Sequence, residues 1–238
     1  MAEFETLVLV PGLNCTGRLF APQIEALKGS CRILVADHRQ DDTMAAIARR
    51  LLSQAPERFA LAGLSMGGYI ALEVLRQAPE RITRLALLDT SARPDTPEAT
   101  ANRHRLMALA EGGRFEEVHT ALWDRLVHPD HRADPAIEET VLTMLRESGP
   151  EAFVRQQRAI IGRADSRPML PGIEIPTLVL VGEQDALTPP ELSREMAEAV
   201  EWASLVVVPR CGHLSTLEQP EAVNRALMAW LTQERGKV

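Results

Sequence analysis

The sequence has few cysteines and no long apolar segment. Its three cysteines, Cys15, Cys31 and Cys211, are odd in number and their spacing matches no metal-binding pattern, so we expect reduced thiols in a cytoplasmic protein. No apolar run reaches the roughly 18–20 residues that a membrane span requires. The acidic segment 1–5 lacks the basic region of a signal peptide. Together these absences predict a cytoplasmic protein without a membrane partner.

The chain also has no excess of positive charge, since its 33 acidic residues outnumber its 26 lysines and arginines. The formal net charge is -7, which argues against nucleic acid as a partner. The chain has no internal repeat, no low-complexity tract, no glycine-rich phosphate loop and no metal-ligand cluster, so we expect neither a cofactor nor a metal. What it does have is the composition of a globular protein, with 45% hydrophobic and 25% charged residues. Its 238 residues suffice for one domain, or for one domain with an insertion.

Short apolar runs alternate with helical patterns along much of the chain. We expect strands at 6–10, 31–36, 59–62, 82–88, 175–181 and 205–208, and helices at 21–27, 43–54, 66–77, 189–200 and 220–233. The β-α order with short links predicts a parallel sheet that is covered by helices on both faces. Thr188 is expected to be the N-cap of the helix that follows it.

The segment around Ser65 carries the strongest chemical signal. Residues 63–67 read Gly-Leu-Ser-Met-Gly, a G-x-S-x-G motif that directly follows an apolar strand and directly precedes a helical stretch. In that context the motif predicts a nucleophile elbow, a sharp turn that holds the serine in a strained backbone conformation with its hydroxyl exposed. The start of the helix aims N–H groups and its positive dipole end at the same point.

A serine nucleophile needs a base, and the base needs an acceptor for its second nitrogen. Asp185 and His213 each follow a predicted strand, so both belong to the carboxyl edge of the sheet, where ligands bind in open parallel sheets. The chain order Ser65, Asp185, His213 is one in which such triads occur. Asp89 also ends a strand and is the alternative acid. Taken singly, Asp185 also fits a turn residue, and His213 a structural or surface histidine.

Residues 92–171 interrupt the β-α rhythm. Four helices are expected there, at 97–111, 114–127, 135–147 and 150–162. The block is too long for a loop, so we predict a helical cap inserted between two parts of an α/β core, 1–91 and 172–238. The strand at 82–88 ends at the same sheet edge as Ser65. The cap should therefore roof the site and determine the choice of substrate.

At these positions the chain resembles the α/β-hydrolase superfamily. The resemblance covers nearly the whole chain and rests on Val10-Pro11-Gly12, residues 63–68, residues 180–185, Gly212-His213 and residues 218–221. It is most similar to small bacterial carboxylesterases and enol-lactonases with a four-helix cap. The resemblance implies an α/β-hydrolase fold with about six mostly parallel strands, because the family's N-terminal two-strand hairpin is absent. Pro11-Gly12 departs from the family's usual His-Gly, without removing a backbone donor.

The resemblance also implies residue roles. Ser65, Asp185 and His213 would be catalytic, and the N–H groups of Leu13 and Met66 would form the oxyanion hole. We expect hydrolysis of a small carboxylic ester or lactone through an acyl-enzyme, without a cofactor, by a monomer or homodimer. Asn14 and Trp123 are candidates for substrate contact. Loop stabilisation explains Asn14 equally well, and a solvated helix face is the default for Trp123.

Other functions stay open on the sequence alone. The same triad serves C–C bond hydrolases and acyltransferases of the superfamily, and a ligand receptor can be built on a hydrolase fold. Dehalogenase and epoxide hydrolase chemistry are disfavoured, because the resemblance implies an aspartate nucleophile where this chain has Ser65. In the cap, the residues that could line a pocket, with a solvated face again the default, are Arg103, His104, His119, Arg155 and Arg163.

Overall fold

The computed structural model describes residues 5–233, and at its centre is one six-stranded sheet. The strands are β1 (Thr6–Val10), β2 (Arg32–Val35), β3 (Phe59–Leu64), β4 (Ile82–Leu88), β5 (Thr177–Gly182) and β6 (Ala203–Val208). Their order is β2-β1-β3-β4-β5-β6, and every neighbouring pair is parallel. The predicted fold class, a mostly parallel sheet of about six strands between helices, is confirmed.

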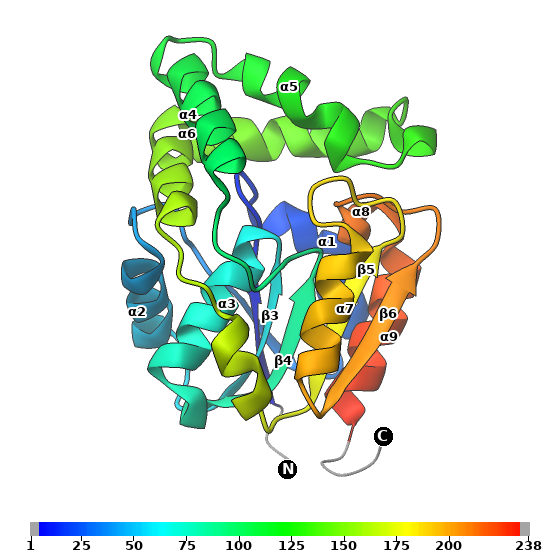
Figure 1. The fold of residues 1–238 in the computed structure, drawn as a ribbon. Coiled ribbons are helices and arrows are strands. Elements are labelled where there is room, and N and C mark those ends of the chain that lie inside the picture. Colours follow the sequence, from blue (N-terminus) through cyan, green and yellow to red (C-terminus); the bar gives the residue numbers. More distant parts are fainter. Residues whose placement is uncertain (1–4, 234–238) are drawn as a thin grey trace.

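Helices cover both faces of the sheet (Figure 1). One face carries α2 (Met44–Gln54), α3 (Met66–Gln77) and α7 (Pro190–Ala199), and the other carries α1 (Ala21–Leu27), α9 (Pro220–Thr232) and the short α8 (Ser215–Glu218). Successive strand residues point to opposite faces. Val8 and Val10 accordingly belong to the core under α2 and α3, whereas Leu7 and Leu9 belong to the core under α1 and α9.

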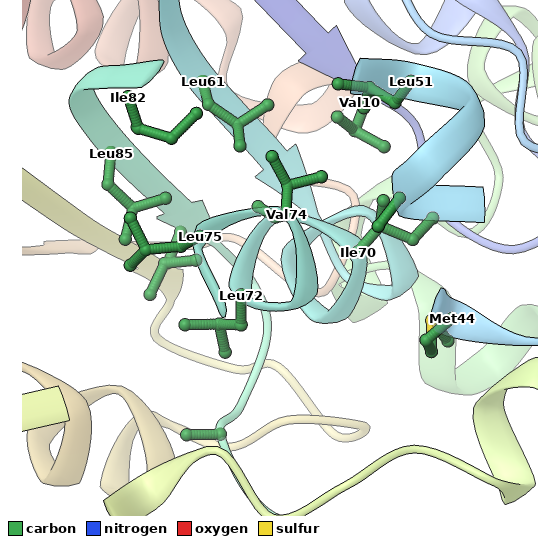
Figure 2. Packing of buried hydrophobic residues seen from close by; sticks show 14 of the residues in the cluster. Val10, Met44, Leu51, Leu61, Ile70, Leu72, Val74, Leu75, Ile82 and Leu85 are labelled. Carbon is green, nitrogen blue, oxygen red and sulfur yellow. The ribbon is translucent and has the colours of Figure 1, made fainter. Parts of the chain in front are cut away.

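Helix α3 is held tightly against the strands that precede and follow it. Figure 2 shows Ile70 and Val74, one helical turn apart, among the side chains that pack with Leu61 of β3 and Leu85 of β4. All four side chains are fully buried, and burial of such a side chain contributes about 1.5–3 kcal/mol each. This packing fixes the N-terminus of α3 at the end of β3, the position that Ser65 occupies.

Three helices, here called the cap helices, lie across the carboxyl ends of the strands (Figure 1). They are α4 (Pro97–Glu111), α5 (Glu116–Leu126) and α6 (Pro135–Ile161). Helix α6 is interrupted at Gly149, whose φ of 77° lies in the left-handed region. The two helices expected at 135–147 and 150–162 are therefore both present, and α6 is the label for the two together, on either side of the kink at Gly149. The division of the chain into core and cap at residues 92 and 171 stays a prediction.

One expected helix start is wrong. Helix α7 begins at Pro190 with Pro189 at the N-cap position, and no side chain caps it. The hydroxyl of Thr188 instead donates a hydrogen bond to Asp185 Oδ2 at 2.7 Å. The three cysteines are buried and form no disulfide. Within residues 5–233, we find no helix with the length and apolar character needed to cross a membrane.

Candidate active site

The turn between β3 and α3 holds Ser65 in a strained conformation. Its φ of 55° and ψ of -115° lie where non-glycine residues are rare. Its amide donates to the carbonyl of Leu88 on β4 at 2.9 Å. A β-carbon at Gly63 would overlap the backbone of Gly67, and one at Gly67 would overlap the carbonyl of Val10. Only glycine fits at these two positions, because the helix start lies in direct contact with the strands.

Ser65, His213 and Asp185 form a continuous chain of hydrogen bonds. Ser65 Oγ lies 2.8 Å from His213 Nε2, and His213 Nδ1 lies 2.8 Å from Asp185 Oδ2. An ionised carboxylate can only accept, so Nδ1 carries the proton. In the neutral ring Nε2 is then the acceptor, and the Ser65 hydroxyl donates to it. The geometry thus allows His213 to take the proton of Ser65.

The loop after β5 keeps Asp185 charged although it is only 2% exposed. Its Oδ1 accepts from the N–H groups of Leu187 and Thr188 at 2.8 and 2.9 Å. Burial by itself raises the pKa of Asp185, but His213 and the Thr188 donors outweigh burial and hold that pKa below its usual value. Burial lowers the pKa of His213, but Asp185, with smaller contributions from Asp89 and Glu218, outweighs burial, so that this pKa lies above its usual value.

The alternative acid, Asp89, lies beside this chain without joining it. Its carboxylate accepts from the Gly182 amide at 2.9 Å and from the Ser215 hydroxyl, and in the described part of the chain it makes no hydrogen bond to His213. Asp89 is fully buried. Burial, and then the charge of Asp185, raise its pKa well above the usual value. The geometry therefore pairs His213 with Asp185 and leaves Asp89 next to the pair.

Two backbone amides near Ser65 are without acceptors. Within residues 5–233, neither the N–H of Leu13 nor that of Met66 has a hydrogen-bond partner. Met66 is the first residue of α3, where a helix cannot supply an acceptor. Leu13 and Ser65 line the same cavity, and Met66 directly follows Ser65 in the chain. The pair can therefore bind a negatively charged oxygen beside Ser65.

Sequence reasoning missed two side chains that hold the loop carrying Leu13. His38 Nε2 donates to the carbonyl of Gly12 at 3.0 Å, and the Gln156 Oε1 accepts from the Asn14 amide at 3.1 Å. Burial lowers the pKa of His38, which favours the neutral ring. His38 lies three residues after the end of β2, at the carboxyl edge, and this position was the signal that could have identified it. Gln156 lies far away in sequence on α6 and gave no signal.

A cavity of about 420 Å³ opens above Ser65 and His213. That volume lies in the range of small-molecule sites. Its walls come mainly from the cap helices and the loop after β1; the apolar part includes Leu106, Val118, Leu122, Leu145 and Ile160, and the polar part includes Asn14, Tyr69, Arg103, His119 and Gln157. The cap helices thus enclose a mostly apolar space with a few polar groups.

The cavity includes one of the two predicted substrate contacts. Asn14 lines it. Trp123 is not one of the lining residues: its Nε1 donates to the carbonyl of Arg132 at 3.2 Å, and its ring lies 5.0 Å from that of His119, which does line the cavity. Trp123 therefore supports the wall from behind. Of the cap residues considered earlier, Arg103 and His119 line the cavity, whereas His104 is exposed and Arg155 donates to the carbonyl of Arg39.

The loop that carries His213 is bonded to the end of α5. Leu126 O accepts from the amides of His213 and Leu214 at 3.0 and 3.2 Å. Glu218, whose side chain is fully buried, accepts from the amides of Gly212, Leu214 and His128 and from His131 Nδ1. The resemblance included Glu218 without giving it a role. Through these contacts the cap helices and the histidine loop are held as one unit.

Within the described residues, no group of three or more His, Cys, Asp or Glu side chains is arranged to hold a metal ion. Cys15 lines the cavity, but burial raises the pKa of its thiol to about 12. The thiol therefore stays protonated and is a poor nucleophile. Ser65 is the side chain whose surroundings suit nucleophilic attack.

Comparisons with known proteins identify the family of the chain. Residues 7–226 match the alpha/beta hydrolase family. The chain belongs to the alpha/beta hydrolase family. An esterase from Thermogutta terrifontis is 32% identical with a TM-score of 0.87, covering 96% of this chain and 90% of the esterase. The enol-lactonase of Burkholderia xenovorans LB400 is 26% identical with a TM-score of 0.89, covering 98% and 93%.

A sequence relative points the same way. 3-Oxoadipate enol-lactonase 2 of Acinetobacter baylyi is 32% identical over 168 residues, which are 70% of this chain and 61% of that enzyme. The family and these relatives together indicate that this alpha/beta hydrolase is a hydrolytic enzyme.

Proposed function

We propose that the protein is a cofactor-independent serine hydrolase that cleaves a small carboxylic ester or lactone. The observation that carries the proposal is the hydrogen-bonded chain from Ser65 through His213 to Asp185 at the floor of the cavity. The free amides of Leu13 and Met66 beside it suit the oxygen that becomes negative during attack on an ester carbonyl. The ester and lactone substrates named for the relatives support this substrate class.

The proposed reaction has two halves. Ser65 Oγ attacks the carbonyl carbon while its proton moves to His213 Nε2, and the Leu13 and Met66 amides bind the oxyanion. Collapse of the tetrahedral intermediate breaks the bond to the leaving oxygen, which takes the proton from His213. Water then attacks the acyl-enzyme, gives a proton to His213 and releases the acid as Ser65 regains its proton. Asp185 holds the Nδ1 proton and stabilises the imidazolium throughout.

A panel of short-chain aryl esters and lactones, together with a fluorophosphonate probe, tests the proposal. We expect rapid multiple turnover of at least one ester and covalent labelling of Ser65. Ser65→Ala should abolish labelling and lower turnover by roughly 10⁶-fold, as loss of a triad serine does elsewhere, while circular dichroism stays native. Full residual turnover in folded Ser65→Ala protein would refute the mechanism.

The same panel separates the other functions of this fold. A receptor would label slowly and stop after a single turnover, and an acyltransferase would pass the acyl group to an added alcohol in preference to water. We propose a small-molecule partner, a monomer or homodimer, and a cytoplasmic location; gel filtration and cell fractionation test the last two.

A further inference from the structure

One polar part of the cavity wall takes no part in the reaction at Ser65. Arg103 on α4 and Gln157 on α6 both line the cavity, and Arg103 Nη1 donates to Gln157 Oε1 at 2.9 Å. Because an arginine nitrogen can only donate, this contact identifies the oxygen end of the Gln157 amide. The nitrogen Nε2 of Gln157 is thereby left buried and, among the described residues, without a hydrogen-bond partner.

The surroundings of this pair are positively charged. The carboxylate of Asp95 lies 2.7 Å from Arg163 Nη1 and 3.1 Å from Arg103 Nε. Its side chain is only 3% exposed. Burial alone raises the pKa of Asp95, but the two guanidiniums outweigh burial and lower that pKa, so the group is ionised. One negative charge here faces two positive charges, and the cluster keeps a net charge of about one positive unit.

Arg103 also has an unused donor. Its Nε is occupied by Asp95 and its Nη1 by Gln157, whereas Nη2 has no hydrogen-bond partner in the part of the chain that the structure describes. The wall therefore presents two neighbouring sets of free N–H groups, Nη2 of Arg103 and Nε2 of Gln157. A buried donor without an acceptor costs about 1–3 kcal/mol, which an acceptor on a bound molecule would recover.

We propose that Arg103 and Gln157 bind a carboxylate on the substrate, so that the hydrolase selects esters or lactones that carry an acid group. This inference rests on the proposed function of Ser65. A carboxylate has two oxygens to accept from both donors, and it supplies the negative charge that the cluster lacks. The other charged lining residues, Glu98 and Arg125, are exposed and opposite in sign, so they do not reverse the charge of the wall.

The test compares matched probes. Monoethyl succinate, glutarate and adipate are paired with ethyl esters in which an isopropyl group replaces the carboxylate. Binding is measured with Ser65→Ala protein by calorimetry, and kcat/KM is measured with the active protein. We expect the half-ester of at least one chain length to bind at least tenfold more tightly than its neutral counterpart, and to react with a similarly higher kcat/KM.

Variants of the cavity wall then identify the residues that cause the preference for half-esters over neutral esters. Arg103→Met and Gln157→Met should each reduce the ratio of half-ester to neutral ester by about 10–100-fold, the loss expected for a hydrogen bond to a charged group. Gln157→Glu keeps the shape of the side chain but adds a negative charge, and should reduce the ratio further. Arg103→Lys should restore part of the preference. The matched control is Arg158→Met, which removes an exposed positive charge next to Gln157 on α6 and should leave the ratio unchanged.

The outcomes distinguish this inference from the proposed function. Equal binding of half-ester and neutral ester by Ser65→Ala protein at every chain length would overturn the carboxylate subsite, whatever the turnover. An equal loss of preference in Arg158→Met would overturn it too, because general surface charge would then explain the effect. Tight half-ester binding without hydrolysis of any probe and without labelling of Ser65 would instead overturn the hydrolase and leave the subsite standing.

Discussion

At the carboxyl edge of the sheet, the side chains of Ser65, His213 and Asp185 are bonded to one another in one continuous chain. On the cap wall above it, Gln157 Nε2 and His119 Nδ1 lie buried without a partner among the described residues. A set of groups that is already bonded needs little rearrangement during reaction. A set with open donors and acceptors can gain partners from a bound molecule. This difference in hydrogen bonding suits the sheet edge to the chemical reaction and the cap wall to substrate recognition.

The largest expected effect on activity comes from the two adjacent carboxylates at the sheet edge, Asp185 and Asp89. Asp185→Asn should lower kcat by about 10⁴-fold, because the amide favours the wrong histidine tautomer. Asp89→Asn should cost far less, since Asp89 bonds to Gly182 and Ser215 and not to His213. The measurement is steady-state kinetics on an aryl ester with both folded variants. If Asp89→Asn were the more damaging change, the acid would have to be reassigned.

The contact between the two regions can be weakened at Glu218. In the native protein, each of the two carboxylate oxygens of Glu218 accepts from two N–H donors. Glu218→Gln replaces one of these oxygens with an amide nitrogen, so about two N–H groups lose their acceptor. At about 1–3 kcal/mol for each, the free energy of unfolding should fall by roughly 2–6 kcal/mol. Denaturant unfolding measures the loss, and turnover should fall with it because the His213 loop loses its anchor. Glu221→Gln, in the first turn of α9, is the exposed-helix control and should change neither quantity.

A substitution on the cap wall should alter selectivity more than reactivity. Ala99→Phe places a ring at the cavity, whereas the same change at Ala108, exposed on the same helix, does not. We expect Ala99→Phe to change the ranking of acyl chain lengths by about 10–100-fold, with fluorophosphonate labelling nearly unchanged. Parallel loss of labelling and turnover in folded protein would mean that the cap supplies groups for the chemistry itself.

The smallest expected effect is on the pH dependence of kcat/KM. Only neutral His213 can accept the Ser65 proton, and Asp185 raises the pKa of His213 above its usual value. The protonated, inactive ring therefore persists to higher pH, and activity is lost as the pH falls through the raised pKa. The acid limb of kcat/KM should have its midpoint above about 6.5, the value of a free histidine. Asp185→Asn should shift that midpoint downward, and a native midpoint below 6.5 would contradict this electrostatic account.

The parts of the molecule that could be predicted are those whose structure is determined by a short stretch of neighbouring residues. The bounds of β1 and β4 were predicted from apolar runs alone, and the turn at Ser65 was predicted because its glycines must stand at fixed offsets from the serine. Thr188 was misread because its sequence context favours a helix cap, while the fold brings its hydroxyl to Asp185. Gln156 depends on a contact between distant segments, which no local pattern encodes, and the only local signal for His38 was its position shortly after a strand. The catalytic roles stay predictions until the variants are measured.

The bond between Leu126 and the His213 loop has a consequence for the timing of turnover. The end of α5 cannot swing away as a free lid, because its last carbonyl holds the two amides of His213 and Leu214. If product leaves without moving the end of α5, His213 stays beside Ser65 and is ready for the next substrate at once. If product leaves by displacing this end, His213 moves away from Ser65 with it, and each release interrupts catalysis until the loop returns.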